Sequence, residues 1–397
     1  MIRKTNIIVA AFVMTVALAV SGCSKNADSG VSSEDVEAAL ENVEESLAEV
    51  GSDESTAEAS EETLDEETTE EAEVIEEPEE EPEEVREGFY RSELTNEWTD
   101  VSIMAQRPIA VMVDNEIKAL PHYGTSKADV VYEMMNSTLN DRITRFMCIF
   151  KDYNNIEQIG SIRSVRTTNL QISPEFNAFV IHDGGPLYIE AYFKAPYVEH
   201  LSGGFSRIKN GKPTEFTEYI SPGEVTKRAE AAGISLEYNE YYQGPHWKFA
   251  SESKPIDLSE VNNAIVCNTI QTPYKHNRSR LEYVEADGVY RYSEYGDEYI
   301  DALTNEHLEF KNVILQESKF VQFDEHGYMN FLIHEGEGMH GYYITNGHGI
   351  PITWYKDKYD MFPSIFYDEE GNVITLNTGK TYVCIIPDDQ WEQLEIR

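Results

Sequence analysis

Ile109-Ala-Val-Met-Val113 is an unbroken apolar run that ends at the polar pair Asp114-Asn115. Four near-continuous apolar runs of the same kind follow, separated by polar turn residues, at residues 130–135, 143–150, 159–162 and 178–181. Strands that are apolar on both faces are typical of a sheet covered on both sides. The runs therefore predict a mixed sheet at the centre of an N-terminal α/β or α+β domain.

Two helices are predicted among these strands. The first begins at Ser164, which directly follows a strand and can cap a first turn, and it ends near Gln171. The second begins at Ser221-Pro-Gly-Glu224, a capping box with proline at the first helical position, and it ends at Gly233. Together these elements place the N-terminal domain at residues 96–240.

A β-rich C-terminal domain is predicted at residues 255–392. Residues 281–292 alternate between polar and apolar types around Asp287-Gly288, a two-residue hairpin signal. Further turn signals occur at Glu325-His-Gly327 and Glu369-Glu-Gly-Asn372. We expect a small, mainly antiparallel sandwich or barrel, joined to the first domain by a polar, aromatic connector.

The first 23 residues have the features of a lipoprotein signal peptide. Arg3 and Lys4 precede an apolar segment, and Val20-Ser-Gly-Cys23 resembles the lipobox of bacterial lipoproteins. The resemblance implies lipidation of Cys23, cleavage before it, and anchoring to the outer face of the cytoplasmic membrane in a Gram-positive-type cell. The alternative is an uncleaved anchor helix, although the apolar run is shorter than the ~20 residues that span a bilayer.

Residues 24–95 have the composition of a disordered, acidic linker. Residues 24–87 carry 27 acids against two bases, which accounts for more than half of the net charge of −42. A short heptad pattern at residues 33–50 favours a frayed helix over a coiled coil, because seven acids without a base oppose self-association. This acidity also excludes nucleic-acid binding by bulk electrostatics, which requires a basic footprint.

No cofactor or metal motif passes its structural test. Gly336-x-Gly338-x-x-Gly341 matches the dinucleotide fingerprint, but it leads into another predicted strand rather than a helix. His334-Glu335 and His340 lack the helical spacing of a zinc protease. Three cysteines lie in apolar runs and are predicted to be buried thiols, with a Cys267–Cys384 bridge left open, at Cys148, Cys267 and Cys384.

The segment Ile159-Gly-Ser-Ile-Arg163-Ser164-Val-Arg166 carries the most specific binding signal. Two arginines flank a predicted helix start, where guanidinium groups, free backbone N–H groups and the helix dipole can together bind a carboxylate or phosphate. The alternative is that one arginine forms an internal ion pair with an acid such as Asp114 or Glu133. Both alternatives remain open from the sequence.

A set of motifs extends beyond this segment. They are Arg107-Pro-Ile-Ala-Val-Met-Val-Asp-Asn115, Lys127-Ala-Asp-Val-Val-Tyr-Glu133, Ile143-Thr-Arg-Phe146, Ile159-Gly-Ser-Ile-Arg-Ser-Val-Arg166 and Phe179-Val-Ile-His-Asp-Gly184, with residues 346–356 and 371–387 near the C-terminus. Together they resemble the DUF3048 family of YerB-type bacterial lipoproteins. The resemblance implies the lipobox, the linker and two domains, but no activity, because the family name records an unknown function.

Three hypotheses for the function follow. The first is a lipid-anchored envelope protein that binds an anionic or glycan component, or a wall-associated protein, without catalysis; its candidate site comprises Asp114, Asn115, Glu133, Arg145, Arg163, Ser164, Arg166 and His182. The second is an envelope hydrolase or transferase that uses Asp114, Glu133 and His182 as acid and base. The third is a protein-interaction module whose contact surface is the aromatic connector Tyr241-Tyr-Gln-Gly-Pro-His-Trp247 or the β-rich domain, although these aromatics could instead pack the seam between the domains.

Overall fold

The computed structural model describes residues 85–335 and 338–397. Cys23, the rest of the predicted signal peptide and residues 24–84 of the predicted linker lie outside the described residues. Within those two ranges, no helix is long and apolar enough to cross a bilayer.

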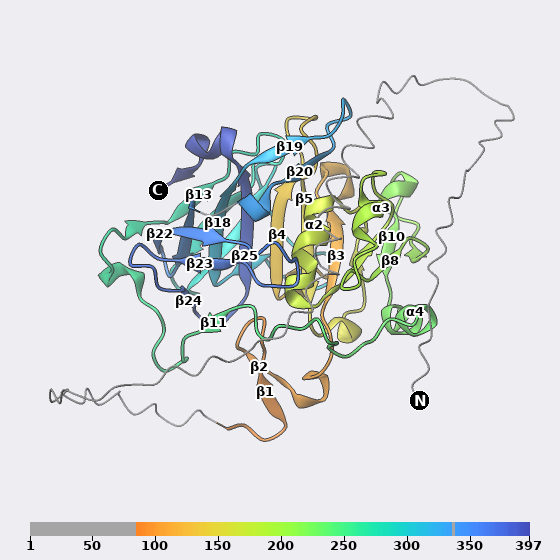
Figure 1. The fold of residues 1–397 in the computed structure, drawn as a ribbon, viewed down its shortest axis with the longest axis horizontal. Helices are drawn as coiled ribbons and strands as arrows, with labels where there is room; N and C mark the ends of the chain where they lie inside the picture. The colour runs from red at the N-terminus through yellow and green to blue at the C-terminus, as the bar shows by residue number, and fades with distance from the viewer. Residues whose placement is uncertain (1–84, 336–337) are drawn as a thin grey trace, which may run out of the picture.

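The largest element is an 11-stranded mixed sheet that contains strands from both predicted domains (Figure 1). Its order is β12-β22-β21-β18-β25-β4-β5-β3-β7-β8, and β23 pairs with β22. The strands from the first region are β3 (Ile109–Asp114), β4 (Val130–Met135), β5 (Thr144–Phe150), β7 (Phe179–His182) and β8 (His200–Ser202). Those from the second are β12 (Ile265–Val266), β18 (Asn312–Ser318), β21 (Met339–Thr345), β22 (His348–Tyr355), β23 (Ile365–Tyr367) and β25 (Thr381–Pro387).

Strands β4 and β25 join the two regions as parallel neighbours in this sheet. Val130 lies opposite Thr381, and Met134 lies opposite Ile385. Every residue of both strands is buried, so neither is suited to a solvent-exposed sheet edge. The mixed sheet predicted for the first region is confirmed, but it continues into the second region instead of ending within residues 96–240.

A second, antiparallel sheet of six strands belongs to the C-terminal region. Its strands are β13 (Thr269–Gln271), β14 (Arg280–Val284), β15 (Val289–Glu294), β16 (Asp297–Glu298), β17 (Glu309–Phe310) and β26 (Glu395–Ile396). The predicted hairpin at Asp287-Gly288 is present, but its last strand pair is Val284 with Val289. Its loop therefore spans residues 285–288 rather than two residues, and Gly288 supplies the positive φ of 65° that the turn needs.

Smaller sheets complete the fold. They pair β1 (Phe89–Arg91) with β2 (Trp98–Asp100), β10 (Glu218–Ile220) with β6 (Ile159–Gly160) and β9 (Ser206–Arg207), β11 (Lys248–Phe249) with β24 (Thr375–Leu376), and β19 (Phe320–Gln322) with β20 (Met329–Phe331). The apolar run at residues 159–162 was expected in the central sheet. It instead forms β6, which pairs with β10 through Ile159 and Gly160.

The helices begin later than the sequence predicts. Helix α2 (Thr167–Ile172) starts after Arg166 rather than at Ser164, and all its residues are buried; Figure 1 shows it in front of the sheet, between the labels of β4 and β3. Helix α3 (Ile189–Tyr192) was not predicted. Helix α4 (Glu224–Ala232) starts two residues after Pro222, and it ends at Gly233 as expected, with a φ of 76°.

The described chain is already ordered before the predicted end of the linker at residue 95. Phe89–Arg91 pairs with Trp98–Asp100, and the Arg91 guanidinium lies 4.0 Å above the Trp98 ring. Nearby, the ammonium of the buried Lys151 donates to Glu93 and to the carbonyl of Met104. The linker boundary is therefore corrected to a point before Phe89, because apolar and charged contacts fix this segment to the sheet.

The aromatic connector packs inside the fold. Trp247 and His246 are buried, and the His246 ring stacks on Phe176 at 4.3 Å. His246 Nε2 also lies 2.7 Å from one carboxylate oxygen of Glu175. The ammonium of Lys356, from the C-terminal region, lies 3.2 Å from the other oxygen of the same carboxylate. These contacts favour the packing alternative for this end of the connector over an exposed contact surface.

The three described cysteines, Cys148, Cys267 and Cys384, are buried and free, so the Cys267–Cys384 bridge is not formed.

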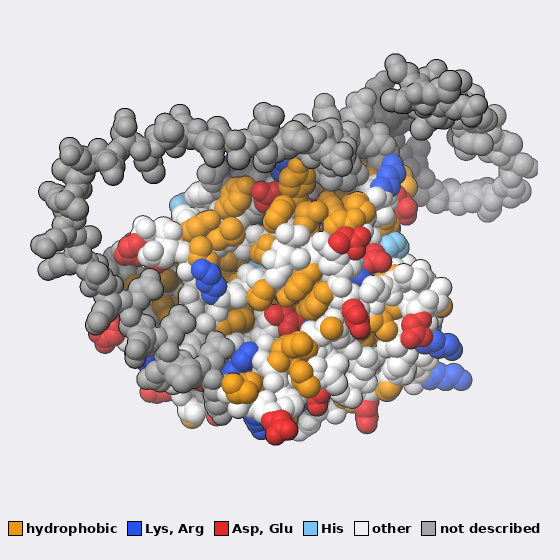
Figure 2. Space-filling model, turned by 60° about the horizontal axis from the view of Figure 1, so that its bottom comes forward, with side chains coloured by type: hydrophobic (Ala, Val, Ile, Leu, Met, Phe, Trp, Pro, Cys, Tyr) orange, Lys and Arg blue, Asp and Glu red, His pale blue; other side chains and the backbone are white. Residues whose placement is uncertain are grey.

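On the surface, Figure 2 shows one face on which hydrophobic side chains lie in separate groups among acidic and basic ones. Basic side chains lie dispersed on this face rather than in one continuous patch.

Candidate functional site

Several candidate residues lie at the carboxyl ends of parallel strands in the central sheet. Strands β3 and β7 are parallel, and β3 and β4 are both antiparallel to β5, so β3, β4 and β7 end at the same edge of the sheet. Asp114 is the last residue of β3, and His182 is the last residue of β7. In open sheets with parallel strands, ligands commonly bind at this edge.

Two arginines converge on Asp114. Arg163 Nε donates to Asp114 Oδ2 at 2.6 Å, and Arg145 Nη2 donates to the same oxygen at 3.4 Å. Burial alone would raise the pKa of Asp114, which is 2% exposed, but the two guanidinium groups outweigh it and hold this pKa below its usual value. Arg163 also reaches the exposed carboxylate of Glu215 at 3.3 Å.

Arg166 lies beside this pair without a carboxylate of its own. Its Nε donates to the carbonyl of Asn136 at 3.1 Å, its Nη1 donates to the carbonyl of Val165 at 3.0 Å, and its guanidinium lies 5.0 Å from the Tyr328 ring centre. Within residues 85–335 and 338–397 it forms no ion pair with an acid. Burial, together with the positive charge of Arg145, lowers the pKa of Arg166 to about 9.

We call Arg145, Arg163 and Arg166 the arginine cluster. Among the described residues, the acids that pair with the cluster are the buried Asp114 and the exposed Glu215, so the three guanidinium groups are incompletely neutralised. Two polar atoms beside the cluster are buried without a hydrogen-bond partner, Arg145 Nε and Asn136 Oδ1. The described chain therefore leaves one donor and one acceptor unpaired at this place.

Ser164 contributes through its backbone rather than as a helix cap. Its hydroxyl donates to the carbonyl of Asp183 at 2.9 Å, and its own carbonyl accepts from Arg145 Nη1 at 2.8 Å. The next two backbone N–H groups, which were expected to face an anion, donate to the carbonyl of Gly184 and to Asn169 Oδ1. These two donors are used within the loop, because the helix starts three residues later than predicted.

Glu133 and Asn115 belong to a separate buried network between the two regions. Glu133 is 0% exposed and accepts hydrogen bonds from hydroxyl groups of Thr144, Ser279, Tyr292 and Tyr382. Burial without a cationic partner raises its pKa. Asn115 donates to Thr144 Oγ1 at 2.8 Å. This network fastens β4 to the C-terminal strands, a role that no motif in the sequence indicated.

His182 is also held apart from the arginine cluster. Its Nδ1 lies 2.8 Å from the carbonyl of Gly184, and its Nε2 lies 3.0 Å from His200 Nδ1. Burial lowers the pKa of His182 to about 4, so the ring is neutral at physiological pH. The structure thus brings together Asp114, Arg145, Arg163, Ser164 and Arg166, but it does not join Glu133, Asn115 or His182 to them.

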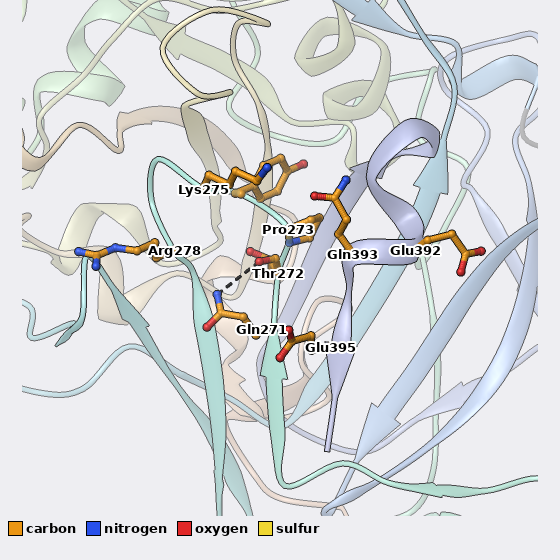
Figure 3. A pocket seen from close by; sticks show the side chains of 9 residues that line it. Gln271, Thr272, Pro273, Lys275, Arg278, Glu392, Gln393 and Glu395 are labelled. Carbon is orange, nitrogen blue, oxygen red and sulfur yellow. Dashed lines mark hydrogen bonds between the residues drawn. The ribbon is translucent and has the colours of Figure 1, made fainter.

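A pocket of about 450 Å³ lies in the C-terminal region, and no sequence motif indicated it (Figure 3). It forms because β13 pairs with β26 and so brings the C-terminal segment beside the residues that follow β13. Its lining residues are Gln271, Thr272, Pro273, Tyr274, Lys275, Arg278, Glu392, Gln393 and Glu395. Two basic and two acidic side chains balance there, so the pocket shows no preference for an ion of either sign.

No group of three or more His, Cys, Asp or Glu residues in the described chain is arranged to hold a metal ion. His334 instead pairs with Asp360, and His340 pairs with Glu317.

Comparison with known families matches both regions of the chain. The model described as "Protein of unknown function (DUF3048) N-terminal domain" matches residues 94–235, and the corresponding C-terminal domain model matches residues 270–383. The chain belongs to the DUF3048 family. The first match contains the whole arginine cluster, and the connector that carries His246 and Trp247 falls between the two matches.

Two relatives in this family are informative. The Bacillus subtilis (strain 168) protein named "Putative lipoprotein YerB" is 25% identical over 308 residues, which cover 75% of this chain and 86% of the relative. A crystal structure of the YerB protein from Bacillus subtilis matches with a TM-score of 0.65 and 22% identity, covering 78% of this chain and 99% of that one. The DUF3048 fold is therefore shared by the two chains.

Proposed function

We propose that this DUF3048 protein is anchored by a lipid on Cys23 to the outer face of the cytoplasmic membrane and binds an anionic component of the envelope at the arginine cluster. The anchor rests on the Val20-Ser-Gly-Cys23 motif and on the likeness to a relative whose name describes a lipoprotein. The acidic composition of the linker favours an extended tether that holds the folded part away from the membrane.

The observation that carries the binding proposal is Arg166. A half-buried guanidinium group commonly lies against a carboxylate, because a charge removed from water without a partner is costly. Arg166 instead has two carbonyl contacts and the neighbouring charges of Arg145 and Arg163. A bound phosphate or carboxylate would neutralise this charge through short, charge-assisted hydrogen bonds.

The same geometry supports binding over catalysis. A hydrolase that used Asp114, Glu133 and His182 would need these groups to face one substrate. Glu133 is enclosed by hydroxyl groups, and His182 is engaged by Gly184 and His200. Asp114 is held as an ion pair by two arginines, which makes it a positioning group for the arginine cluster rather than a proton donor.

The test is the affinity of the detergent-solubilised full chain for inorganic phosphate, measured by calorimetry. Arg166→Ala removes charge-assisted hydrogen bonds worth ~1.5–3 kcal/mol each, so phosphate affinity should fall roughly 10- to 150-fold. Arg228→Ala is the matched control, because Arg228 contacts backbone carbonyls at a different loop, residues 202–203. Equal affinities in the wild type and Arg166→Ala would overturn the proposal.

A further inference from the structure

An aromatic surface borders the arginine cluster and is built from both regions of the chain. Tyr328 lies under the Arg166 guanidinium, at 5.0 Å from the ring centre to Cζ. The rings of Tyr188 and Phe323 lie 4.6 Å apart at an angle of 41°. We call Tyr188, Phe323 and Tyr328 the aromatic rim; all three are partly exposed.

The rim is held in place by the turn between β19 and β20. One carboxylate oxygen of Asp324 accepts from the backbone N–H groups of His326 and Tyr328, and the other accepts from the Tyr188 hydroxyl at 3.4 Å. Asp324 is only 6% exposed at its side chain, so its charge is used within the turn. The turn also contacts the loop after β4, where the Thr138 N–H donates to the carbonyl of Gly327.

The loop after β4 links the rim to the arginine cluster. Asn136, in this loop, accepts from Arg166 Nε through its carbonyl, while the oxygen of its side-chain amide is buried without a partner. Three kinds of group therefore lie side by side: the Arg166 guanidinium, which has no ion pair within the described residues, a buried amide oxygen that lacks a hydrogen-bond partner, and partly exposed aromatic rings.

We infer that the ligand of the arginine cluster is an anionic glycan, whose phosphate or carboxylate binds Arg166 and whose sugar ring packs on the aromatic rim. This inference rests on the proposed function and names its ligand class. A sugar ring offers a flat C–H face that packs on an aromatic ring. An anionic lipid would need a continuous apolar surface for its chains, which three partly exposed rings do not supply.

The experiment compares four probes on the detergent-solubilised full chain: inorganic phosphate, glycerol 1-phosphate, N-acetylglucosamine 1-phosphate and uncharged N-acetylglucosamine. The sugar phosphate is expected to bind about tenfold more tightly than inorganic phosphate, because only it contacts both the cluster and the rim. The uncharged sugar should bind most weakly. If glycerol 1-phosphate binds as tightly as the sugar phosphate, the sugar ring makes no contribution and the inference is overturned.

Variants separate this inference from the proposed function. Phe323→Ala and the aliphatic variant Phe323→Leu should lower sugar-phosphate affinity to that of inorganic phosphate and leave phosphate affinity unchanged. Val321→Ala, in the exposed part of the same hairpin, is the matched control and should change neither. If phosphate binds but both Phe323 variants keep full sugar-phosphate affinity, the glycan inference fails and the proposed function stands. If the wild type binds none of the anionic probes, both fail.

Discussion

Glu294 offers a sharp test of how the two regions are fastened together. It is the last residue of β15, 2% exposed, and its Oε1 is buried without a hydrogen-bond partner. Its Oε2 accepts only a 3.4 Å hydrogen bond from Asn277. Burial, reinforced by the nearby carboxyl of Glu133, raises the pKa of Glu294 well above its ordinary value of 4.5. The carboxyl is therefore protonated in the folded state at a pH where the unfolded chain has already lost this proton.

The sign of the pH dependence follows from this difference. Because the folded-state pKa is raised, the contribution of Glu294 to stability is complete below 4.5 and is lost as the pH rises toward the folded-state pKa. The loss is about 1.4 kcal/mol of unfolding free energy for each pH unit in that interval. Glu294→Gln has nearly the same shape and cannot ionise. The unfolding free energy of this variant, relative to that of the wild type, should therefore increase by this amount per pH unit.

The assay is denaturant unfolding of the wild type and Glu294→Gln at several values between about pH 5 and pH 7, since only their difference isolates one carboxyl. Glu298→Gln is the matched control, because Glu298 is an exposed glutamate on the neighbouring strand β16. Stability curves of the wild type and Glu294→Gln that run parallel over this range would refute the account of Glu294 as a buried, protonated acid.

Three further predictions concern the cluster and the anchor. Arg163→Ala should lower the unfolding free energy by about 1.5–3 kcal/mol, since it removes the shorter hydrogen bond to the buried Asp114. Arg166→Ala should lower it by less than about 1 kcal/mol, and equal losses of the two variants in denaturant unfolding would contradict this difference. Cys23→Ala should abolish incorporation of labelled fatty acid and membrane fractionation, and a variant that is still labelled would disprove the lipoprotein assignment. Deleting residues 27–84 should shift the melting temperature by no more than about two degrees, because the composition of this stretch offers little apolar surface for a core; a large drop in a thermal scan would mean that it packs on the fold.

Much of the sheet could be predicted from the sequence, because continuous apolar runs such as 109–113 and 130–135 identify strands that are buried on both faces. The pairing of β4 with β25 could not be predicted, since it joins residues about 250 positions apart and no local pattern encodes a parallel neighbour.

The predicted helix starts were wrong for a local reason. Ser164 is a good capping residue and Pro222 is favoured at the first helical position. However, the Ser164 hydroxyl donates to the carbonyl of Asp183, and Gly223 adopts a left-handed conformation before α4.

The candidate site was predicted in part. Arg163 and Arg166 could be singled out because two bases flank a predicted helix start in an acidic protein. Of the two alternatives left open for them, an ion pair with an internal acid is present between Arg163 and Asp114. Glu133 and His182 also stand at the ends of apolar runs in the sequence motifs. In the structure, however, Glu133 accepts hydrogen bonds in a buried network and His182 pairs with His200. The order of the strands decides which of these side chains meet, and no local pattern encodes that order. The aromatic rim likewise forms only because a hairpin more than 130 residues away in the sequence packs beside Tyr188.

The most direct test of the central claim is a crystal structure of this chain soaked with selenate, whose anomalous signal locates the anion without ambiguity. The account predicts a selenate within hydrogen-bond distance of the Arg166 guanidinium and adjacent to Arg145 and Arg163, and it predicts that this peak is lost in Arg166→Ala crystals. An arginine cluster without a peak, in crystals whose selenate lies elsewhere on the protein, would contradict the proposal that this edge of the sheet binds an anion.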